Sequence, residues 1–332
     1  MIIKQNITGL NTLRFLCFLV IFINHATPYF HYGFLAVDFF FTLSGFLITL
    51  LAFNEIQLTG TVNRWNFFMR RILRIWPLYF VIISFSFFIL PLIMRRYGLS
   101  ITLPDKKIYY WLFISNYDYG DYHFAFKQLW TIAVEEQFYL LFILLSFFLK
   151  NHFWKIIFLL SIIWTSTIIY SQINSDINLY SNTLYHLISF LAGMIVAKIV
   201  FAKSYTKSAI MYVTIIVSFI LTIWFINESA LKQYMKIPFS IFAGSVILMI
   251  CQQQNKIEKK KMFLKPTEQL GKYTYGLYIY SGFIISAGTQ FLKWENKPLL
   301  YAAELICTII IATLSYHFFE IPFLKLKEKF RR

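Results

Sequence analysis

Cysteine and charge are both scarce in this chain. Its three cysteines, Cys17, Cys251 and Cys307, lie within or at the ends of apolar stretches and form no Cys-x-x-Cys pair, which argues against a disulfide framework or a zinc site. Only 14% of the residues are charged, and the sequence has no tandem repeat and no long linker. This low share of charged residues argues against a soluble globular domain of ordinary composition, and we expect no second soluble domain.

Apolar sequence, by contrast, is abundant. Hydrophobic residues make up 58% and aromatic residues 20% of the 332 residues, and the mean hydropathy is +0.61. An apolar run of about 20 residues can cross a bilayer as a helix. We therefore predict an all-α polytopic membrane protein, a single domain over residues 1–332 built as a bundle of about ten transmembrane helices. The predicted spans lie near 10–29, 33–53, 76–94, 128–149, 154–171, 180–202, 209–226, 236–253, 273–293 and 298–322.

The distribution of positive charge predicts the orientation in the membrane. Most of the 31 lysines and arginines fall in the predicted inner loops and the tail, so the positive-inside rule favours both termini in the cytosol. The first apolar run is long and lacks a small-residue cleavage site, so we expect no cleavable signal peptide. The net charge of +16 is scattered over short loops, which indicates contact with anionic membrane lipid and not with nucleic acid.

The first span carries two ionisable residues, Arg14 and His25. Their spacing of eleven residues returns to within about 20° of the same helical face, roughly 16 Å further along the axis. Ionisable groups inside a membrane are costly and must face protein, water or a ligand. We therefore interpret both as candidate functional residues.

A carboxylate follows near the start of the second span. Asp38 shares one helical face with Thr42 and Gly45. Only a short connection separates the first two spans, so we expect Asp38 to lie near His25, where it would fix the imidazole tautomer and raise its basicity, as a general base requires. The alternative is that Asp38 caps the helix start and His25 sits at the membrane interface.

Three arginines crowd the predicted inner end of the third span. Arg70, Arg71 and Arg74 fall on one helical turn, an arrangement of like charges that is unfavourable unless an anion lies among them. Guanidinium groups suit phosphates. A simple topology anchor is the alternative, and for this segment taken alone it is the stronger interpretation.

Two adjacent glutamates open the fourth span. Glu135 shares a face with Thr131 and Tyr139, and Glu136 follows directly. Burying both carboxylates as anions would be prohibitive, so one is expected to be protonated or paired, as acid–base chemistry or recognition of a substrate hydroxyl would use. Two glutamates at a wet interfacial turn are the alternative.

The outer loop over 95–127 is rich in aromatic and acidic side chains, including Tyr119 and Asp121, and suits a carbohydrate. Tyrosine and tryptophan also gather at membrane interfaces whatever the substrate. The remaining histidines show no partner pattern, and we interpret them as interfacial or packing residues. They are His31, His152, His186 and His317.

The order of these segments resembles membrane acyltransferase family 3, the O-acyltransferases that decorate cell-surface glycans, and the resemblance covers nearly the whole chain. The matching segments are Arg14 with His25, the stretch 33–46 ending in Ser44-Gly45-Phe46, 71–77, Trp130 with Glu135 and Phe138-Tyr139, 271–278, and Glu320-Ile-Pro322. There is one departure, because the family commonly has a histidine where this chain offers Tyr280 and Ser281. We also expect the chain to lack the periplasmic esterase-like domain that the family often carries.

The resemblance implies an acyltransferase of the bacterial cytoplasmic membrane that uses cytosolic acyl-CoA, most simply acetyl-CoA, and no metal. Its acceptor would be a hydroxyl of a surface or lipid-linked glycan, and its partners could include glycan-assembly membrane proteins. His25 would be the general base, oriented by Asp38, while Glu135 positions the acceptor. The other implied roles are donor binding by Arg14, Arg70, Arg71 and Arg74, and substrate binding by Trp130, Glu136, Tyr139, Tyr119 and Asp121.

Three alternatives stay open. An acyl-enzyme on Ser44 would be another chemical route, although the Ser44-Gly45 pair is more typical of helix packing in membranes. A transporter or flippase of lipid-linked glycan would also need charge inside the membrane, but we see neither related halves nor matching broken spans. A non-catalytic accessory membrane protein would explain the topology, but not why four ionisable residues lie within apolar spans, namely Arg14, His25, Asp38 and Glu135.

Overall fold

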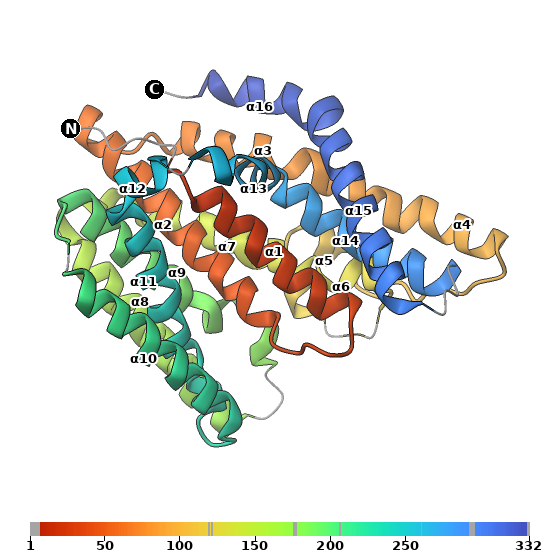
Figure 1. Ribbon diagram of the computed structural model, residues 1–332, viewed down its shortest axis with the longest axis horizontal. Helices are drawn as coiled ribbons and strands as arrows, with labels where there is room; N and C mark the ends of the chain where they lie inside the picture. Colours follow the sequence, from red (N-terminus) through yellow and green to blue (C-terminus); the bar gives the residue numbers. More distant parts are fainter. Residues whose placement is uncertain are drawn as a thin grey trace. The chain divides into compact units, whose positions relative to one another are not determined.

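The computed structural model describes residues 7–118, 120, 122–174, 178–205, 207–259, 261–291 and 296–330. Within these ranges the chain is helical and contains no strand. It forms two compact units, each described below by itself, and Figure 1 labels the helices. Unit 1 comprises Met1–Cys17, Phe34–Val62 and Leu144–Gly271, and unit 2 comprises Phe18–Gly33, Asn63–Ile143 and Lys272–Arg332.

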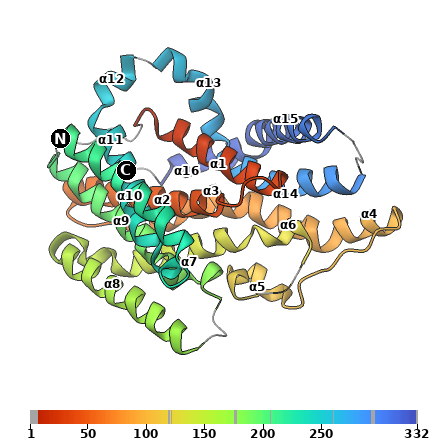
Figure 2. The same cartoon turned by 60° about the horizontal axis from the view of Figure 1, so that its bottom comes forward.

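Unit 1 contains a group of long helices and two short ones. The long helices are α2 (Phe34–Thr59), α8 (Leu149–Ile173), α9 (Thr183–Ala202), α10 (Ser208–Asn227) and α11 (Lys236–Gln252). Two short helices, α12 (Gln254–Lys259) and α13 (Lys261–Lys272), follow α11, as Figure 2 shows. The first helix, α1 (Leu10–Ala26), begins in unit 1 and ends in unit 2.

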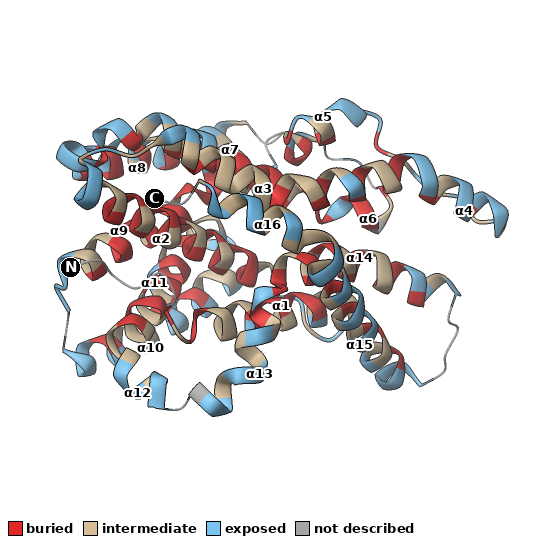
Figure 3. Ribbon diagram, turned by 90° about the horizontal axis from the view of Figure 1, so that it is seen from above, coloured by how far each residue is buried: buried red, intermediate tan, exposed pale blue. Residues whose placement is uncertain are grey.

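Glycines hold α2 and α9 close together. A Cβ atom at Gly45 would collide with the carbonyl oxygen of Phe190, and one at Gly193 would collide with that of Thr42. Small residues at such contacts let two helical backbones approach closely, which is how membrane helices gain packing energy. Both helices are largely buried, as the red in Figure 3 shows. Gly45 therefore has the packing role that the Ser44-Gly45 pair suggested.

Unit 2 contains both long and short helices, including two π-helices. Its helices are α3 (Arg64–Ser84), the π-helix η1 (Phe85–Ile89), α4 (Leu90–Arg96), α5 (Lys107–Trp111), α6 (Phe124–Lys127), α7 (Trp130–Leu145), α14 (Thr274–Phe291), α15 (Lys297–Ser315), the π-helix η6 (Tyr316–Glu320) and α16 (Ile321–Glu328). Single 3-10 turns occur at Ser115–Tyr117 in unit 2 and, in unit 1, at Ser146–Phe148, Leu179–Ser181 and Lys232–Tyr234.

Seven helical runs in the described ranges are long and apolar enough to cross a membrane. They are Phe34–Thr59, Arg64–Arg96, Ala125–Ile173, Thr183–Ala202, Ser208–Asn227, Lys232–Gln252 and Lys297–Glu328. α1 is apolar but shorter, at 17 residues. The prediction of a helical protein with several membrane spans is thus confirmed, whereas the number ten, the cytosolic termini and the single domain stay predictions.

Two predicted boundaries differ from the structure. The third span was expected to begin at residue 76, but its helix begins at Arg64, where the Asn63 side chain accepts a hydrogen bond from the Asn66 N–H at 3.0 Å. The arginine-rich first turns lower the local hydropathy, so an apolar window misses them. The fourth and fifth spans form one run of 49 residues that bends at His152, whose backbone is non-helical.

Candidate active site

A polar seam joins α3, α7 and α14 within unit 2. The Trp76 indole N–H donates to Glu136 Oε2 at 3.1 Å, which links α3 to α7. The Tyr275 hydroxyl donates to the Ile75 carbonyl at 2.7 Å, and the Tyr278 hydroxyl lies 3.0 Å from the Thr131 hydroxyl. These hydrogen bonds hold polar side chains in place between helices that are otherwise apolar.

Glu136 has one carboxylate oxygen left over. Its side chain is 3% exposed, and Oε1 has no hydrogen-bond partner in the part of the chain that the structure describes. A buried acceptor without a donor is costly, which makes it a natural contact for a ligand hydroxyl or amide. The neighbouring Glu135 is half-buried and interacts electrostatically with Arg71. The alternative interpretation of this pair, two glutamates at a wet interfacial turn, does not fit Glu136, because its side chain is buried.

The three clustered arginines of α3, Arg70, Arg71 and Arg74, have different partners within unit 2. The Arg70 guanidinium donates to the Phe330 carbonyl at 2.7 Å, just after α16. The Arg71 guanidinium lies 5.1 Å from the centre of the Tyr139 ring, within the range of a cation–π contact. Arg74 interacts electrostatically with the carboxylate of Glu320. These contacts offset part of the repulsion among the three arginines. Phosphate binding by the arginines stays a prediction.

Other predicted residues lie near the ends of helices. His25 is half-buried in the last turn of α1, and Trp130 is the half-buried first residue of α7. The connection after α1 turns back on that helix, because the Gly33 N–H donates to the Asn24 side-chain oxygen at 3.0 Å. A Cβ at position 33 would collide with the Asn24 side chain, so the turn requires glycine there.

The loop over 95–127, predicted to lie outside, is more tightly packed than the carbohydrate interpretation assumed. Tyr110 is 2% exposed, and burial, with a smaller effect of Asp118, raises the pKa of its hydroxyl. The Tyr122 hydroxyl donates to Asp118 Oδ1 at 2.7 Å. These tyrosines therefore pack against the protein and do not offer open ring faces. The predicted residues Tyr119 and Asp121 lie outside the described residues.

Ser286 and His123 resemble a nucleophile and its general base, but the hydrogen bonds place the ring proton on the His123 nitrogen that faces the serine. His123 Nδ1 accepts the Ala125 N–H at 3.2 Å, so the ring proton is on Nε2, which donates to the Ser286 hydroxyl oxygen at 2.9 Å. A base must accept the serine proton, and this tautomer cannot. Burial lowers the pKa of His123, which favours the neutral ring with this arrangement.

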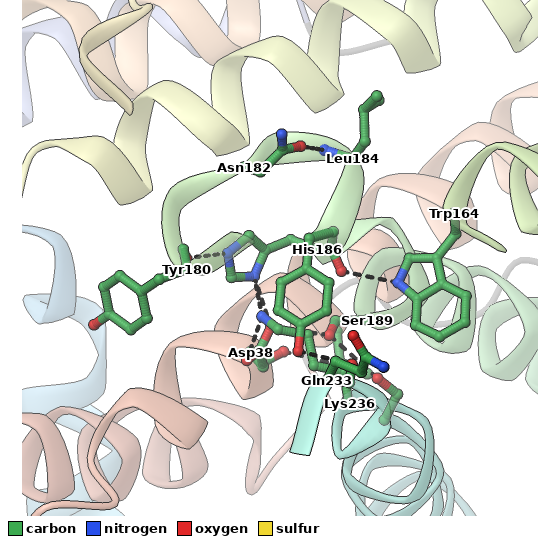
Figure 4. A network of polar contacts seen from close by, with 12 residues as sticks. Asp38, Trp164, Tyr180, Asn182, Leu184, His186, Ser189, Gln233 and Lys236 are labelled. Carbon is green, nitrogen blue, oxygen red and sulfur yellow. Dashed lines mark hydrogen bonds and ion pairs between the residues drawn. The ribbon is translucent and has the colours of Figure 1, made fainter. Parts of the chain in front are cut away.

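A charged triad of Asp38, His186 and Lys236 lies within unit 1 (Figure 4). The Lys236 ammonium lies 2.9 Å and 3.0 Å from the two Asp38 oxygens, and His186 Nδ1 lies 2.8 Å from Asp38 Oδ1. The Ser189 hydroxyl donates to the same oxygen at 3.1 Å. All three charged residues are 3% exposed or less, so the triad is a buried ionic network near the N-terminal ends of α2, α9 and α11.

The hydrogen bonds restrict where the protons of the triad can be. His186 Nε2 must donate, because its partner at 2.9 Å is the Tyr180 carbonyl oxygen. Nδ1 lies 2.6 Å from the Lys236 nitrogen, so one proton can sit on either atom without changing the net charge. The Tyr185 ring centre is 4.3 Å from that nitrogen and favours the ammonium form of Lys236.

His186 and Lys236 correct the sequence analysis. We interpreted His186 as an interfacial or packing residue and gave Lys236 no role, yet both are buried partners of Asp38. A signal was present, because His186 lies inside a predicted span and an ionisable residue there deserved the same weight as His25. Arg14 and Asp38 belong to unit 1 and His25 to unit 2, and the pairing of Asp38 with His25 stays a prediction.

The fold and the polar clusters define an integral membrane protein of helices with buried ionisable groups, and comparison with known proteins identifies its family. The family model described as an acyltransferase domain matches residues 7–317. The chain therefore belongs to this acyltransferase family, and the resemblance predicted from its motifs is confirmed.

Individual relatives are O-acetyltransferases by name. O-acetyltransferase OatA of Staphylococcus aureus is 29% identical over 344 residues, covering 96% of this chain and 57% of that protein. Peptidoglycan O-acetyltransferase OatA of Listeria monocytogenes is 29% identical over 322 residues, covering 88% of this chain and 51% of that protein. The chain thus spans little more than half the length of these relatives. No solved structure matches the chain.

Proposed function

We propose that this chain is a membrane O-acetyltransferase that moves an acetyl group from cytosolic acetyl-CoA to a hydroxyl of a surface glycan. The observation that carries the proposal is the match of residues 7–317 to an acyltransferase domain. The names of these relatives support acetyl as the acyl group and peptidoglycan as the first acceptor to test. The proposed location is the bacterial cytoplasmic membrane, with both termini in the cytosol.

The donor would be held by arginines. We assign the phosphates of the nucleotide to Arg70, Arg71 and Arg74, since guanidinium groups bind phosphate in a fixed fork. Arg14 would contact the pantetheine arm. The cation–π contact between Arg71 and Tyr139 supports the assignment, because it holds the guanidinium between helices instead of leaving it free in water.

The chemistry is a direct transfer. The acceptor hydroxyl oxygen attacks the thioester carbonyl carbon, a C–O bond forms, and the C–S bond breaks. His25 takes the hydroxyl proton as general base and returns it to the sulfur, so that the products are the acetyl ester and the free thiol of CoA. No oxidant, reductant or metal is needed.

The acceptor would be held by residues of α7. Glu135 would position the hydroxyl, and the unpartnered oxygen of Glu136 supports a second contact to the sugar. Trp130, Tyr119 and Asp121 are the other proposed contacts. Asp38 would orient His25 while it keeps its bonds to His186 and Lys236, so replacing Asp38 is expected to affect both stability and turnover.

The test is acetyl transfer by the purified chain in lipid, with radiolabelled acetyl-CoA and peptidoglycan fragments. We compare the wild type with His25→Ala and with His31→Ala, a matched control because His31 is an exposed histidine of the same unit. Thermal unfolding of each variant in detergent checks that it folds.

Label on the glycan with the wild type and His31→Ala, but not with His25→Ala, is the expected result. If the wild type releases no CoA while lipid-linked glycan crosses the membrane, the flippase interpretation replaces this one. If His25→Ala transfers label at the wild-type rate, the base is another residue.

A further inference from the structure

The helix that carries Arg14 begins without the local residues that normally cap a helix. In a capping box, the side chain before the helix accepts the N–H of its third residue, and a glutamate at that third position accepts the N–H of the cap. Here the cap position is Gly9, whose carbonyl accepts the first helical bond from Leu13 at 2.9 Å, and the third position is Thr12. Glycine has no side chain that could accept the N–H of the third residue, and the first turn of α1 has no acidic residue that could accept the N–H of the cap.

The carboxylate of Glu268, far away in the sequence, accepts both backbone hydrogen bonds that a capping box would satisfy. Glu268 Oε1, on α13, accepts the Gly9 N–H at 2.7 Å and the Thr12 N–H at 3.1 Å. The same oxygen accepts the Thr12 hydroxyl at 3.1 Å. A negative charge at a helix N-terminus also opposes the helix dipole. Glu268 is therefore the cap of α1, supplied across 259 residues of sequence.

Two further contacts hold the same end of α1, and all of them lie within unit 1. The Gln254 amide, at the start of α12, clamps Thr8, because its oxygen accepts the Thr8 N–H at 3.1 Å and its NH₂ donates to the Thr8 carbonyl at 2.9 Å. A Cβ at Gly271 would collide with the Asn11 carbonyl oxygen, so the end of α13 lies directly on the first turn of α1. α12 and α13 together act as a clasp.

The side chain of Asn11 connects Glu268 of α13 to Arg14 of α1. The Asn11 amide donates to Glu268 Oε2, and its oxygen accepts from the Arg14 guanidinium, each at 3.5 Å. We propose that Glu268 is a positioning residue for the acyl donor, which caps α1 from α13 and so holds Arg14 in its donor-binding position. The inference rests on the proposed function, in which Arg14 contacts the pantetheine arm of acetyl-CoA.

The experiment measures KM for acetyl-CoA and kcat separately. Without the cap, the first turn of α1 frays in the free protein, and donor binding must reorder it. We expect Glu268→Ala to raise KM for acetyl-CoA about fivefold, with kcat nearly unchanged. Glu228→Ala is the matched control, since Glu228 is an exposed carboxylate at the end of α10 in the same unit, and its KM should equal that of the wild type.

Two more variants separate capping from general damage. Thr12→Glu places a carboxylate at the third position of α1, so adding it to Glu268→Ala should bring KM back toward the wild-type value. If Glu268 acts through Arg14, adding Glu268→Ala to Arg14→Gln should raise KM no further.

A wild-type KM in Glu268→Ala, or additive effects of the two substitutions, overturns the positioning role while leaving the proposed function intact. A drop in kcat without rescue by Thr12→Glu would make Glu268 merely structural and also overturns it. If the wild type itself transfers nothing from acetyl-CoA, the proposed function fails first.

Discussion

At the scale of single residues, the behaviour of Asp38 depends on two partners that lie 148 and 198 positions away in the sequence. The pair with Lys236 is fully buried, so each charge depends on the other for the solvation that it lost. Asp38 therefore links the N-terminal parts of α2, α9 and α11 through buried contacts, whatever its role in the proposed reaction. The motif around residue 38 indicated an important carboxylate, but it could not reveal these partners.

Replacing Lys236 by methionine should be severe. Lys236→Met removes the ammonium that pairs with the buried Asp38 carboxylate, and we expect a loss of about 3–5 kcal/mol in the free energy of unfolding. Adding Asp38→Asn should recover much of that loss, because no buried charge is then left. Thermal and denaturant unfolding in detergent measure both.

The control is Lys232→Met, which removes an exposed lysine four residues earlier. Equal stability of the Lys236 and Lys232 variants would contradict the buried triad.

At the scale of helices, close packing between α2 and α9 depends on the absence of side chains. Gly45 and Gly193 each face a backbone carbonyl of the other helix, which cannot move aside as a side chain could. Gly244 of α11 differs, since a Cβ there would meet the end of the Val196 side chain at 3.1 Å.

We therefore predict that Gly193→Ala lowers the free energy of unfolding by about 1–3 kcal/mol through overpacking. Gly244→Ala, the matched control, should cost clearly less, because Val196 can yield. Thermal unfolding of the two variants side by side in detergent makes the comparison. A larger loss in Gly244→Ala would show that the α2–α9 contact is looser than described.

At the scale of the whole molecule, the orientation in the membrane is the main prediction still to be tested. Positive charge places the loop before α10 inside and the loop after it outside. α10 is strongly apolar and mostly exposed, as expected for a helix that faces lipid.

Two variants with one added cysteine, each built on Cys307→Ser, test this orientation. In intact cells, a membrane-impermeant maleimide should label Ser229→Cys but label Ser204→Cys only after the membrane is opened. Both serines are exposed, and serine to cysteine changes one atom. Cys307→Ser is the background control, because Cys307 is exposed and would itself react, whereas Cys17 and Cys251 are buried. Labelling of both variants from outside would show that α10 does not cross.

The sequence alone determined the class and the family of this protein. Apolar runs identify membrane helices because the bilayer core requires about 20 apolar residues, and ordered motifs over the whole chain indicated the acyltransferase family that the comparison confirmed. Spacing along one helix also predicted local groupings such as Glu135 with Tyr139, since helical geometry is fixed.

Only the tertiary structure decided which distant groups meet. The pairing of Asp38 with His186 and Lys236, and the capping of α1 by Glu268, join residues 148 to 259 positions apart. Local periodicity carries no information about such contacts, because they depend on how whole helices pack. The sequence therefore indicated acyl transfer and the ionisable residues inside the spans. The packing of the helices decided which side chains hold Asp38 and the start of α1 in place.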